Sequence, residues 1–214
     1  MVETLATAMV GGSFDPVHLG HLHLVHTVLT QTEYRRFIFI PVAINNFKQQ
    51  NHPTSSIHRL EMLRLSCDSY RTVYPDDKPC SLVVDDSELK RGGISYTYDT
   101  VKQLYLTYSV KGRIALVMGD DLLDSLRDWH EFSALKELVT FVVIRRSNEA
   151  PSFFDPTMDL RYIDSTVYED SSSSIRNQLG ALRPAEEMPC EVRNLMCKEV
   201  ARYVDEHRLY RSES

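Results

Sequence analysis

Two histidines three residues apart, His18 and His21, are side chains whose type and spacing could carry out chemistry. They follow a glycine pair, Gly11 and Gly12, and they stand at the start of a stretch whose apolar residues recur at helical spacing. Residues three apart share one face of a helical turn, so both imidazoles would point in the same direction. An imidazole can be cationic, or can donate a hydrogen bond while neutral, and either form stabilises charge that builds on phosphate oxygens. The pair therefore predicts chemistry on a phosphate.

The elements around these residues are expected to be a strand, a glycine turn and a helix. Residues 4–10 form a short, mostly apolar run that favours a buried strand, and residues 19–30 favour an amphipathic helix. Glycines between such elements let backbone N–H groups approach a ligand at the amino end of the helix, where the partial positive charge suits an anion. Glycine turns are also common as plain structural punctuation, so the turn alone leaves both interpretations open.

A metal site is the alternative use of the histidines in this stretch, which are His18, His21, His23 and His26. No cysteine or glutamate completes the set at the spacing typical of zinc sites, so the sequence disfavours zinc. We expect His23 and His26 to be helix-surface or packing residues, and we expect no metal ion held by protein side chains.

A second candidate anion site lies at the serine run 171–174, which is followed by Ile175 and Arg176. Four serines are typical of a flexible linker, but a linker does not continue into an apolar-periodic helix. A helix that starts with serines offers hydroxyls, N–H groups and one guanidinium to the same anion. We therefore expect a serine-capped helix that binds phosphate.

The rest of the chain alternates apolar runs with helical segments. Further strands are predicted at residues 36–42, 81–84, 113–118, 138–144 and 160–163. This alternation predicts an α/β fold, a Rossmann-like open, mainly parallel sheet with helices on both faces. Residues 171–214 are expected to be a C-terminal helical part of the same domain, with one amphipathic helix over 190–210.

The segments between the second and third strands carry further expectations. Residues 43–53 are polar and are expected to be a loop at the carboxyl edge of the sheet, where ligands bind in such folds. Residues 54–56 offer helix caps for a helix over 57–69, in which Arg59 would ordinarily be solvated. Residues 85–88, after the third strand, are expected to be a charged, flexible turn.

Length and composition fit one globular domain spanning residues 1–214, because 43% hydrophobic residues can bury a substantial core. The net charge of -6 argues against a nonspecific nucleic-acid binder, and no apolar run approaches the roughly 18 residues of a membrane span. The four cysteines contain no CxxC pair, which fits reduced thiols, and no signal peptide is predicted. We expect a cytoplasmic protein without nucleic-acid or membrane partners, and a homo-oligomer stays open.

The two anion-binding segments resemble the signatures of one known superfamily. Residues 12–21 resemble the G-x-F-D-P-x-H-x-G-H signature of the nucleotidyltransferases, whose HxGH motif is related to the HIGH motif of class I aminoacyl-tRNA synthetases. Residues 171–176 resemble the second signature, S-S-T-x-I-R, with Ser173 in place of threonine. The superfamily transfers a nucleoside monophosphate from a triphosphate and releases pyrophosphate. The resemblance implies ATP contacts at Gly11, Gly12, Ser13, Phe14, His18, Gly20, His21, Lys48, Gly119, Asp121, Ser172, Ile175 and Arg176.

Two further segments resemble one branch, the nicotinate mononucleotide adenylyltransferases. Residues 95–101 resemble the branch motif S-Y-T-x-D-T-[LV], which by itself indicates only a capped helix start. Residues 119–129 resemble the segment G-x-D-S-L followed by a tryptophan, with Leu122 in place of the serine. The branch implies that Trp129 stacks on the pyridine ring, an interaction worth on the order of 1 kcal/mol beyond area burial. The implied mononucleotide contacts are Asp15, Lys48, Thr97, Trp129, His130 and Arg145.

The chain departs from the branch after the second strand. The usual P-P-H-K is replaced by Asn45-Asn46-Phe47-Lys48, so only Lys48 is retained for contact with the ATP phosphates. Only the resemblance marks Arg59 as a candidate functional residue, because its place on a helix does not. The run 203–210 is also typical of the branch, and we expect it to serve packing.

The resemblance implies an enzyme that joins ATP and nicotinate mononucleotide to give nicotinate adenine dinucleotide and pyrophosphate, with Mg2+ accompanying ATP. The implied catalytic residues are His18, His21 and Arg176. Nicotinamide mononucleotide and phosphopantetheine are alternative acceptors. The segment that contains Trp129 argues against phosphopantetheine. A noncatalytic nucleotide-sensing module is the alternative from another class, and the intact histidines and arginine disfavour it.

Overall fold

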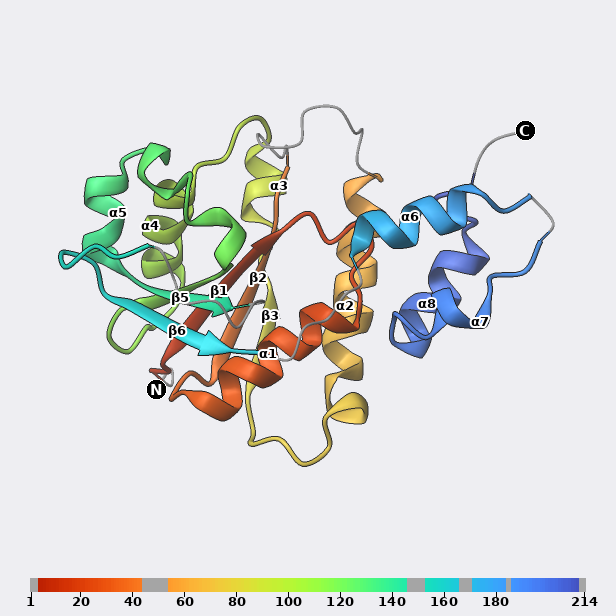
Figure 1. Cartoon of the computed structure of the whole chain (residues 1–214), viewed down its shortest axis with the longest axis horizontal. Helices are drawn as coiled ribbons and strands as arrows, with labels where there is room; N and C mark the ends of the chain where they lie inside the picture. The colour runs from red at the N-terminus through yellow and green to blue at the C-terminus, as the bar shows by residue number, and fades with distance from the viewer. Residues whose placement is uncertain (1–3, 44–53, 146–152, 166–170, 184–185, 212–214) are drawn as a thin grey trace.

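The computed structural model describes residues 4–43, 54–145, 153–165, 171–183 and 186–211. Within these residues one six-stranded sheet has the order β3-β2-β1-β4-β5-β6, and every neighbouring pair is parallel (Figure 1). The strands are β1 (Thr7–Gly12), β2 (Arg36–Pro41), β3 (Ser81–Val84), β4 (Ile114–Gly119), β5 (Val139–Arg145) and β6 (Leu160–Asp164). The predicted α/β fold with a mainly parallel sheet is confirmed.

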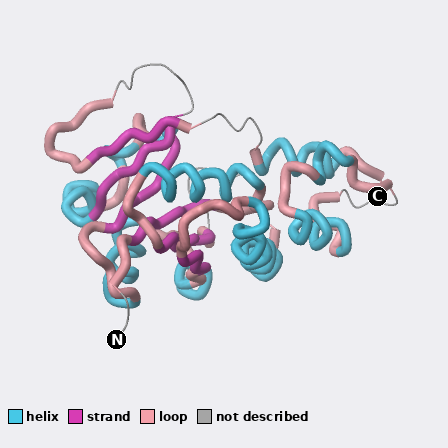
Figure 2. The backbone as a smooth tube through the Cα atoms, turned by 90° about the horizontal axis from the view of Figure 1, so that it is seen from below, coloured by secondary structure: helices cyan, strands magenta, loops and turns pink. Residues whose placement is uncertain are grey.

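Helices connect the strands and cover both faces of the sheet (Figure 2). They are α1 (Leu19–Gln31), α2 (Ser56–Val73), α3 (Ser87–Arg91), α4 (Thr97–Thr107), α5 (Phe132–Leu138), α6 (Ser172–Gly180), α7 (Cys190–Arg193) and α8 (Lys198–Glu206). Two 3-10 turns, η1 (Asp120–Leu122) and η2 (Leu126–Asp128), follow β4. In Figure 1, α6, α7 and α8 gather beyond α2, at the end of the molecule away from α4 and α5. No helix among the described residues combines the length and the apolar character that crossing a membrane requires.

Alternation along the strands divides the core into two layers. In β1, Ala8 and Val10 belong to the layer that includes α1, α2 and the C-terminal helices, whereas Met9 belongs to the layer of α4 and α5. The same alternation runs along β2, where Phe37 is in the first layer and Ile38 in the second. Successive side chains of a strand point to opposite faces, so a strand covered on both faces is apolar throughout. Fully burying each such side chain contributes about 1.5–3 kcal/mol.

The first strand begins and ends later than expected. Gly11 and Gly12 are its last two residues and pair with Ile40 and Pro41 of β2. The amide of Val42 also donates to the carbonyl oxygen of Gly12 at 3.0 Å. The glycines are therefore strand residues, because the neighbouring strand supplies backbone partners up to its own end.

The predicted helix over residues 190–210 is wrong, because the chain forms two helices, α7 and α8. The carbonyl oxygen of Leu195, between them, accepts a hydrogen bond of 2.8 Å from the amide of Leu19 at the start of α1. Met196 and Cys197 are buried at the same break. The break thus satisfies a backbone donor of α1 and buries two apolar side chains, although no glycine or proline marks it.

The ends of α2 and the structure of residues 85–88 also differ from the sequence-based expectation. Helix α2 runs to Val73, beyond the expected end, and Ser55 occupies its N-cap position without a side-chain hydrogen bond. Residues 85–88 do not form a flexible turn, because α3 starts at Ser87. The side chain of Glu88 is 4% exposed and accepts a 2.5 Å hydrogen bond from Oγ1 of Thr100 in α4.

Candidate active site

The strand order predicts where a ligand binds. The chain builds β1, β2 and β3 outward in one direction and then returns to add β4, β5 and β6 on the other side. In open parallel sheets, ligands bind at the carboxyl ends of the strands where the direction reverses. The reversal lies between the ends of β1 at Gly12 and β4 at Gly119. Residues 13–18, which we call the signature loop, follow β1 at this point.

The two histidines lie at the amino end of α1 and are held by backbone amides. The amide of Gly20 donates to Nδ1 of His18 at 3.2 Å, and the amide of His18 donates to Nδ1 of His21 at 3.1 Å. A ring nitrogen that accepts an N–H bond carries no proton, so each neutral ring has its proton on Nε2. His18 is the N-cap residue, so the expected shared helical turn is wrong. The capping box nevertheless brings the ring centroids to 4.0 Å.

The ring of Phe14 lies close to Gly12, the second glycine of the pair. A Cβ atom built on Gly12 would lie 3.1 Å from the ring of Phe14, which is 1% exposed. The ring in turn meets His21 edge to face, with centroids 5.0 Å apart. Gly11 is exposed, and a Cβ atom there would meet nothing within 4 Å. A side chain at Gly12 would thus crowd the ring of Phe14, whereas Gly11 leaves the backbone open to solvent.

Asp15 anchors the signature loop inside the protein. Its carboxylate is part of a side chain that is 5% exposed, and Oδ1 accepts a 2.8 Å hydrogen bond from the hydroxyl of Tyr210. Oδ2 accepts a 3.2 Å hydrogen bond from the amide of Thr54. Burial, followed by the charge of Asp15, raises the pKa of Tyr210, so the phenol stays a donor. Asp15 was predicted to contact the mononucleotide, and the structure gives it protein partners on both oxygens.

Arg59 holds the same loop from α2. Its guanidinium donates from Nη1 to the carbonyl oxygens of Ser13 at 2.9 Å and Val42 at 3.0 Å, and from Nε to that of Thr54 at 3.1 Å. The side chain is 2% exposed, which corrects the expectation of a solvated arginine. Burial lowers the pKa of Arg59, and the nearby Asp15 and Tyr210 act in the opposite direction. Arg59 therefore ties the ends of β1 and β2 to the start of α2.

The amino end of α6 packs against the signature loop. The hydroxyl of Ser172 donates to the carbonyl oxygen of Pro16 at 2.9 Å, and Nη1 of Arg176 donates to the carbonyl oxygen of Asp15 at 2.6 Å. The hydroxyl of Ser171 caps the helix by accepting from the amide of Ser174 at 3.2 Å, as predicted. These bonds bring together the two segments that the sequence singled out for phosphate binding.

Ile175 lies deeper than its predicted contact with adenine requires. Its side chain is 0% exposed and belongs to the core layer of α1 and α2. A side chain so placed packs against the protein, so a contact with adenine would fall to its backbone.

The segments predicted to bind the mononucleotide come together near the carboxyl end of β4. Thr97 is the first residue of α4, and its neighbour Tyr96 lies over the ring of His130, with centroids 4.2 Å apart. Trp129, which directly follows η2, is half-buried against the core layer of α4 and α5. Asp121 is exposed in η1, directly after β4. Ser95 does not cap α4, because Tyr96 occupies the N-cap position without a side-chain bond.

Arg145 has a protein partner at this edge of the sheet, and Lys48 is not described. Arg145 is the last residue of β5, and its guanidinium forms an ion pair with Asp164 at the end of β6. Lys48, and with it the segment Asn45-Asn46-Phe47, lies outside the residues that the structure describes. In the described parts of the chain, no group of three or more His, Cys, Asp or Glu side chains is arranged to hold a metal ion.

Comparison with known proteins identifies the family. The cytidylyltransferase-like family matches residues 9–178, which include both segments that were predicted to bind phosphate. The nicotinate-nucleotide adenylyltransferase of Bacillus subtilis is 32% identical over 94% of this chain and 96% of that protein. The chain belongs to the nicotinate-nucleotide adenylyltransferase branch of the cytidylyltransferase-like family.

A second relative of this adenylyltransferase aligns over less of its length. The probable nicotinate-nucleotide adenylyltransferase of Treponema pallidum is 38% identical over 64% of this chain, and the match spans 63% of that protein. A solved structure, Plasmodium falciparum nicotinic acid mononucleotide adenylyltransferase complexed with NaAD, has a TM-score of 0.70 at 18% identity. That match covers 96% of this chain and 97% of the other, and it supports the fold.

Sequence reasoning missed two residues that hold the candidate active site in place. Arg59 was expected to be solvated, and Tyr210 was expected only to pack, yet both hold the signature loop. The sequence signal for Arg59 was its place among apolar residues of a helix, where a charged side chain needs buried partners. Tyr210 gave no such signal, because its partner Asp15 is 195 residues away.

Proposed function

We propose that this adenylyltransferase transfers AMP from ATP to the 5′-phosphate of nicotinate mononucleotide, in NAD biosynthesis. The products are nicotinate adenine dinucleotide and pyrophosphate. The observation that carries the proposal is the meeting of the signature loop with the amino end of α6, through Ser172 and Arg176. The similarity to the Bacillus subtilis enzyme over nearly its full length supports the same reaction.

The ATP phosphates would lie at the amino ends of α1 and α6. Helix amino ends carry free N–H groups and partial positive charge, so two of them favour a polyphosphate. His18 and His21 would donate from Nε2, because their Nδ1 atoms already accept backbone amides. Arg176 would add a charge-assisted contact. The nucleoside would lie beside the ends of β1 and β4, at Gly11, Gly119 and Asp121. Lys48, which is not among the described residues, is expected to contact the phosphates.

The mononucleotide would lie at the segments around α4 and η2. Trp129 would stack on the pyridine ring, which is electron-poor, in an offset arrangement. The amino end of α4, at Thr97, offers free N–H groups for the ring carboxylate, and His130 lies beside it against Tyr96. Arg145 would act only after leaving Asp164, so it is the weakest member of this set.

The reaction needs positioning and charge neutralisation more than proton transfer. A 5′-phosphate oxygen of the mononucleotide attacks the α-phosphorus of ATP, the bond to the bridging oxygen breaks, and pyrophosphate leaves with those electrons. The attacking phosphate is already anionic near neutral pH, so no general base is required. The protein orients the two phosphates and stabilises the charge on the equatorial oxygens.

Mg2+ would enter with ATP and not through a protein cage. The described side chains at the amino ends of α1 and α6 offer two imidazoles, one guanidinium and hydroxyls, which are poor ligands for a hard cation that prefers charged oxygen ligands. Triphosphate oxygens and water would therefore hold the ion, and when bound it supplies neutralisation of the β- and γ-phosphate charge.

The test is a comparison of two acceptors. We expect the purified protein to release pyrophosphate from ATP and Mg2+ with nicotinate mononucleotide, and to do so with a higher kcat/KM than with nicotinamide mononucleotide. His21→Ala is the control for the site, because losing one stabiliser of developing charge lowers kcat by about a hundredfold. Equal or greater efficiency with the amide would reverse the acceptor assignment. Absence of pyrophosphate with either acceptor would favour the nucleotide-sensing alternative.

A further inference from the structure

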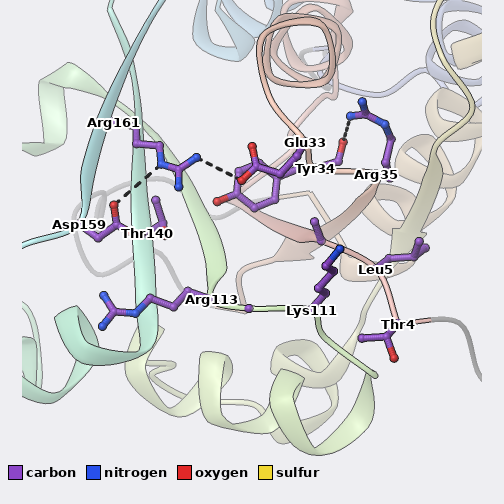
Figure 3. Close-up of a pocket in the computed structure, with 12 residues that line it drawn as sticks. Thr4, Leu5, Glu33, Tyr34, Arg35, Lys111, Arg113, Thr140, Asp159 and Arg161 are labelled. Carbon is purple, nitrogen blue, oxygen red and sulfur yellow. Dashed lines mark hydrogen bonds and ion pairs between the residues drawn. The ribbon is translucent and has the colours of Figure 1, made fainter.

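A cavity of about 440 Å³ lies at the edge of the sheet opposite the candidate active site, and its charged side chains point in different directions (Figure 3). Arg161 is paired with Glu33 at 3.2 Å. Lys111 and Arg113 extend to opposite sides of the turn that joins them. One small anion would therefore not meet both cations. The amino end of α4 differs in this respect, because several polar side chains converge there.

The segment 85–91, which includes α3, is bonded to both ends of α4 through carboxylates. At the amino end, Oε1 of Glu88 accepts a 2.5 Å hydrogen bond from Oγ1 of Thr100, and that oxygen accepts a 3.2 Å hydrogen bond from Nη2 of Arg91. At the carboxyl end, Oδ2 of Asp85 accepts a 2.9 Å hydrogen bond from the hydroxyl of Tyr108. Helix α4 is therefore held at each end by a separate hydroxyl–carboxylate bond.

The first turn of α4 is the place where the ring carboxylate of the mononucleotide is proposed to bind. Thr97 and Thr100 are three residues apart, so they lie on one face of that turn. The bond from Thr100 to Glu88 therefore fixes the direction in which the N–H groups at Thr97 point. The guanidinium of Arg91, bonded to the same Thr100, offsets the charge of Glu88 beside an anionic ligand.

Two buried oxygen atoms near this bond have no hydrogen-bond partner among the residues that the structure describes. They are Oε2 of Glu88, whose side chain is 4% exposed, and Oγ of Ser95. Burial raises the pKa of Glu88, and Ser95 is among the groups that lower it, so the two side chains are neighbours. A buried polar atom without a partner is unfavourable, so a small movement that lets Ser95 donate to Oε2 would be stabilising.

The segment 92–96, which carries Ser95 into α4, has room for such a movement. Gly92 and Gly93 have φ values of +68 and +66, and a Cβ atom on either would meet nothing within 4 Å. Ile94 is 55% exposed and Tyr96 is 40% exposed, so neither side chain is locked in the core. Residues at the ends of elements commonly absorb the backbone changes of a hinge. The segment can therefore shift without repacking either core layer.

We propose that Glu88 is a positioning residue for the mononucleotide, with Oε1 holding Thr100 throughout and Oε2 accepting the hydroxyl of Ser95 when nicotinate mononucleotide binds. The second bond fixes the segment 92–96 where it enters α4, so that the amides around Thr97 stay directed at the ring carboxylate. Binding thus pairs two oxygen atoms that lack partners in the free protein. The inference rests on the proposed acceptor and deepens the description of its site.

Ser95→Ala separates positioning from stability. The Kd for nicotinate mononucleotide, measured by calorimetry, and its KM in the pyrophosphate assay should both rise about tenfold, the loss expected from one hydrogen bond to a charged group. The KM for ATP should not change. The urea midpoint should not fall, because the hydroxyl has no partner in the free protein. Unchanged affinity for the mononucleotide, or a lower urea midpoint, would overturn the proposal.

Thr100→Val and Tyr108→Phe form a matched pair, because each removes one hydroxyl–carboxylate bond from one end of α4. Both variants should lower the urea midpoint. Only Thr100→Val should also raise the Kd and KM for nicotinate mononucleotide, since only that bond lies at the amino end of the helix. An equal rise in both variants would show that α4 needs general support only, and the positioning role of Glu88 would be wrong.

The same measurements distinguish this inference from the proposed reaction. A wild-type protein that binds nicotinate mononucleotide but releases no pyrophosphate would overturn the reaction, and the Kd values of the three variants would still decide the role of Glu88. A wild-type protein that does not bind the mononucleotide would overturn both.

Discussion

For single residues, the hydrogen bonds accepted by the Nδ1 atoms of His18 and His21 determine which ring nitrogen carries the proton. Each Nδ1 accepts a backbone amide, at 3.2 Å for His18 and 3.1 Å for His21, so in the neutral ring only Nε2 can donate a hydrogen bond to a ligand. This arrangement gives the neutral imidazole a fixed tautomer, because a cationic ring would have no acceptor at Nδ1. The rings are thus both helix caps and candidate phosphate donors.

The two tasks of His18 can be separated by substitution. His18→Ala should lose the cap at a cost of about 1 kcal/mol in free energy of unfolding, whereas His18→Asn should keep it, because asparagine is a strong N-cap residue. Both variants should lower kcat about a hundredfold, since neither retains Nε2. Urea unfolding and steady-state pyrophosphate release would measure the two effects. Near-normal turnover in His18→Asn would show that His18 is only a cap.

Glu88 gives a pH-dependent prediction. Burial raises its pKa, against the effects of its hydrogen bond with Thr100 and the charge of Arg91. A carboxyl with a raised folded-state pKa contributes stability that is complete below the unfolded pKa, about 4.3, and is lost as pH rises through the folded pKa. Glu88→Gln should therefore gain stability relative to wild type at pH 8, and the difference should shrink toward pH 5. Urea unfolding at both values measures this, and a difference independent of pH would contradict it.

At the scale of elements, the C-terminal end of the chain and the signature loop are joined by one side-chain contact. The hydroxyl of Tyr210 donates to the buried carboxylate of Asp15 at 2.8 Å, next to the carbonyl group that Arg176 binds. The residues after α8 therefore support the loop that precedes α1. This contact connects the C-terminal residues of the described chain to the candidate active site.

Tyr210→Phe tests that connection. The variant keeps the ring but leaves a carboxylate oxygen of Asp15 without this donor, which costs about 1–3 kcal/mol for a buried group. We expect a loss of unfolding free energy in that range together with a lower kcat, because the signature loop loses an anchor. Tyr203→Phe is the matched control, since its hydroxyl contacts the half-buried His58 at 2.9 Å on the surface between α2 and α8. Equal effects of the two variants would contradict a special role for Tyr210.

At the scale of the whole molecule, the sheet should be stable from its centre outward. Each of β1, β2, β4 and β5 pairs on both sides, whereas β3 and β6 pair on one side only. The residues of β3 are all half-buried, while those of β2 are all buried. Amides of half-exposed edge strands open more easily than those of a buried centre.

Native-state hydrogen exchange would measure this order. We expect the amides of β1, β2, β4 and β5 to exchange through global unfolding, with the slowest rates in the protein. The amides of β3 and β6 should exchange faster through local opening, and their free energies should depend less on denaturant. Equal protection across all six strands would contradict this order and would indicate a single cooperative unit.

Local patterns in the sequence were enough to predict the strands, most helices and the segments that carry the candidate site residues. The runs that became β1 to β6 are apolar, and the Ser171 cap and the spacing of His18 and His21 are local patterns. Such signals depend on near neighbours in the chain, so they can be read without the fold. The expectation that ligands bind at the carboxyl edge of the sheet needs only parallel strands, whereas the strand order, and with it the point of reversal between β1 and β4, came from the structure.

How those segments are held depends on contacts between distant parts of the chain, which are seen only in the folded structure. Leu195 splits the last helix because a backbone donor of α1 needs its carbonyl oxygen, and Glu88 is buried because Thr100 lies opposite it. Arg59 and Tyr210 support the signature loop through contacts that span up to 195 residues. A hydrogen-bond partner far along the chain leaves no periodic trace in the sequence, and burial that makes such a bond necessary exists only after the layers have packed.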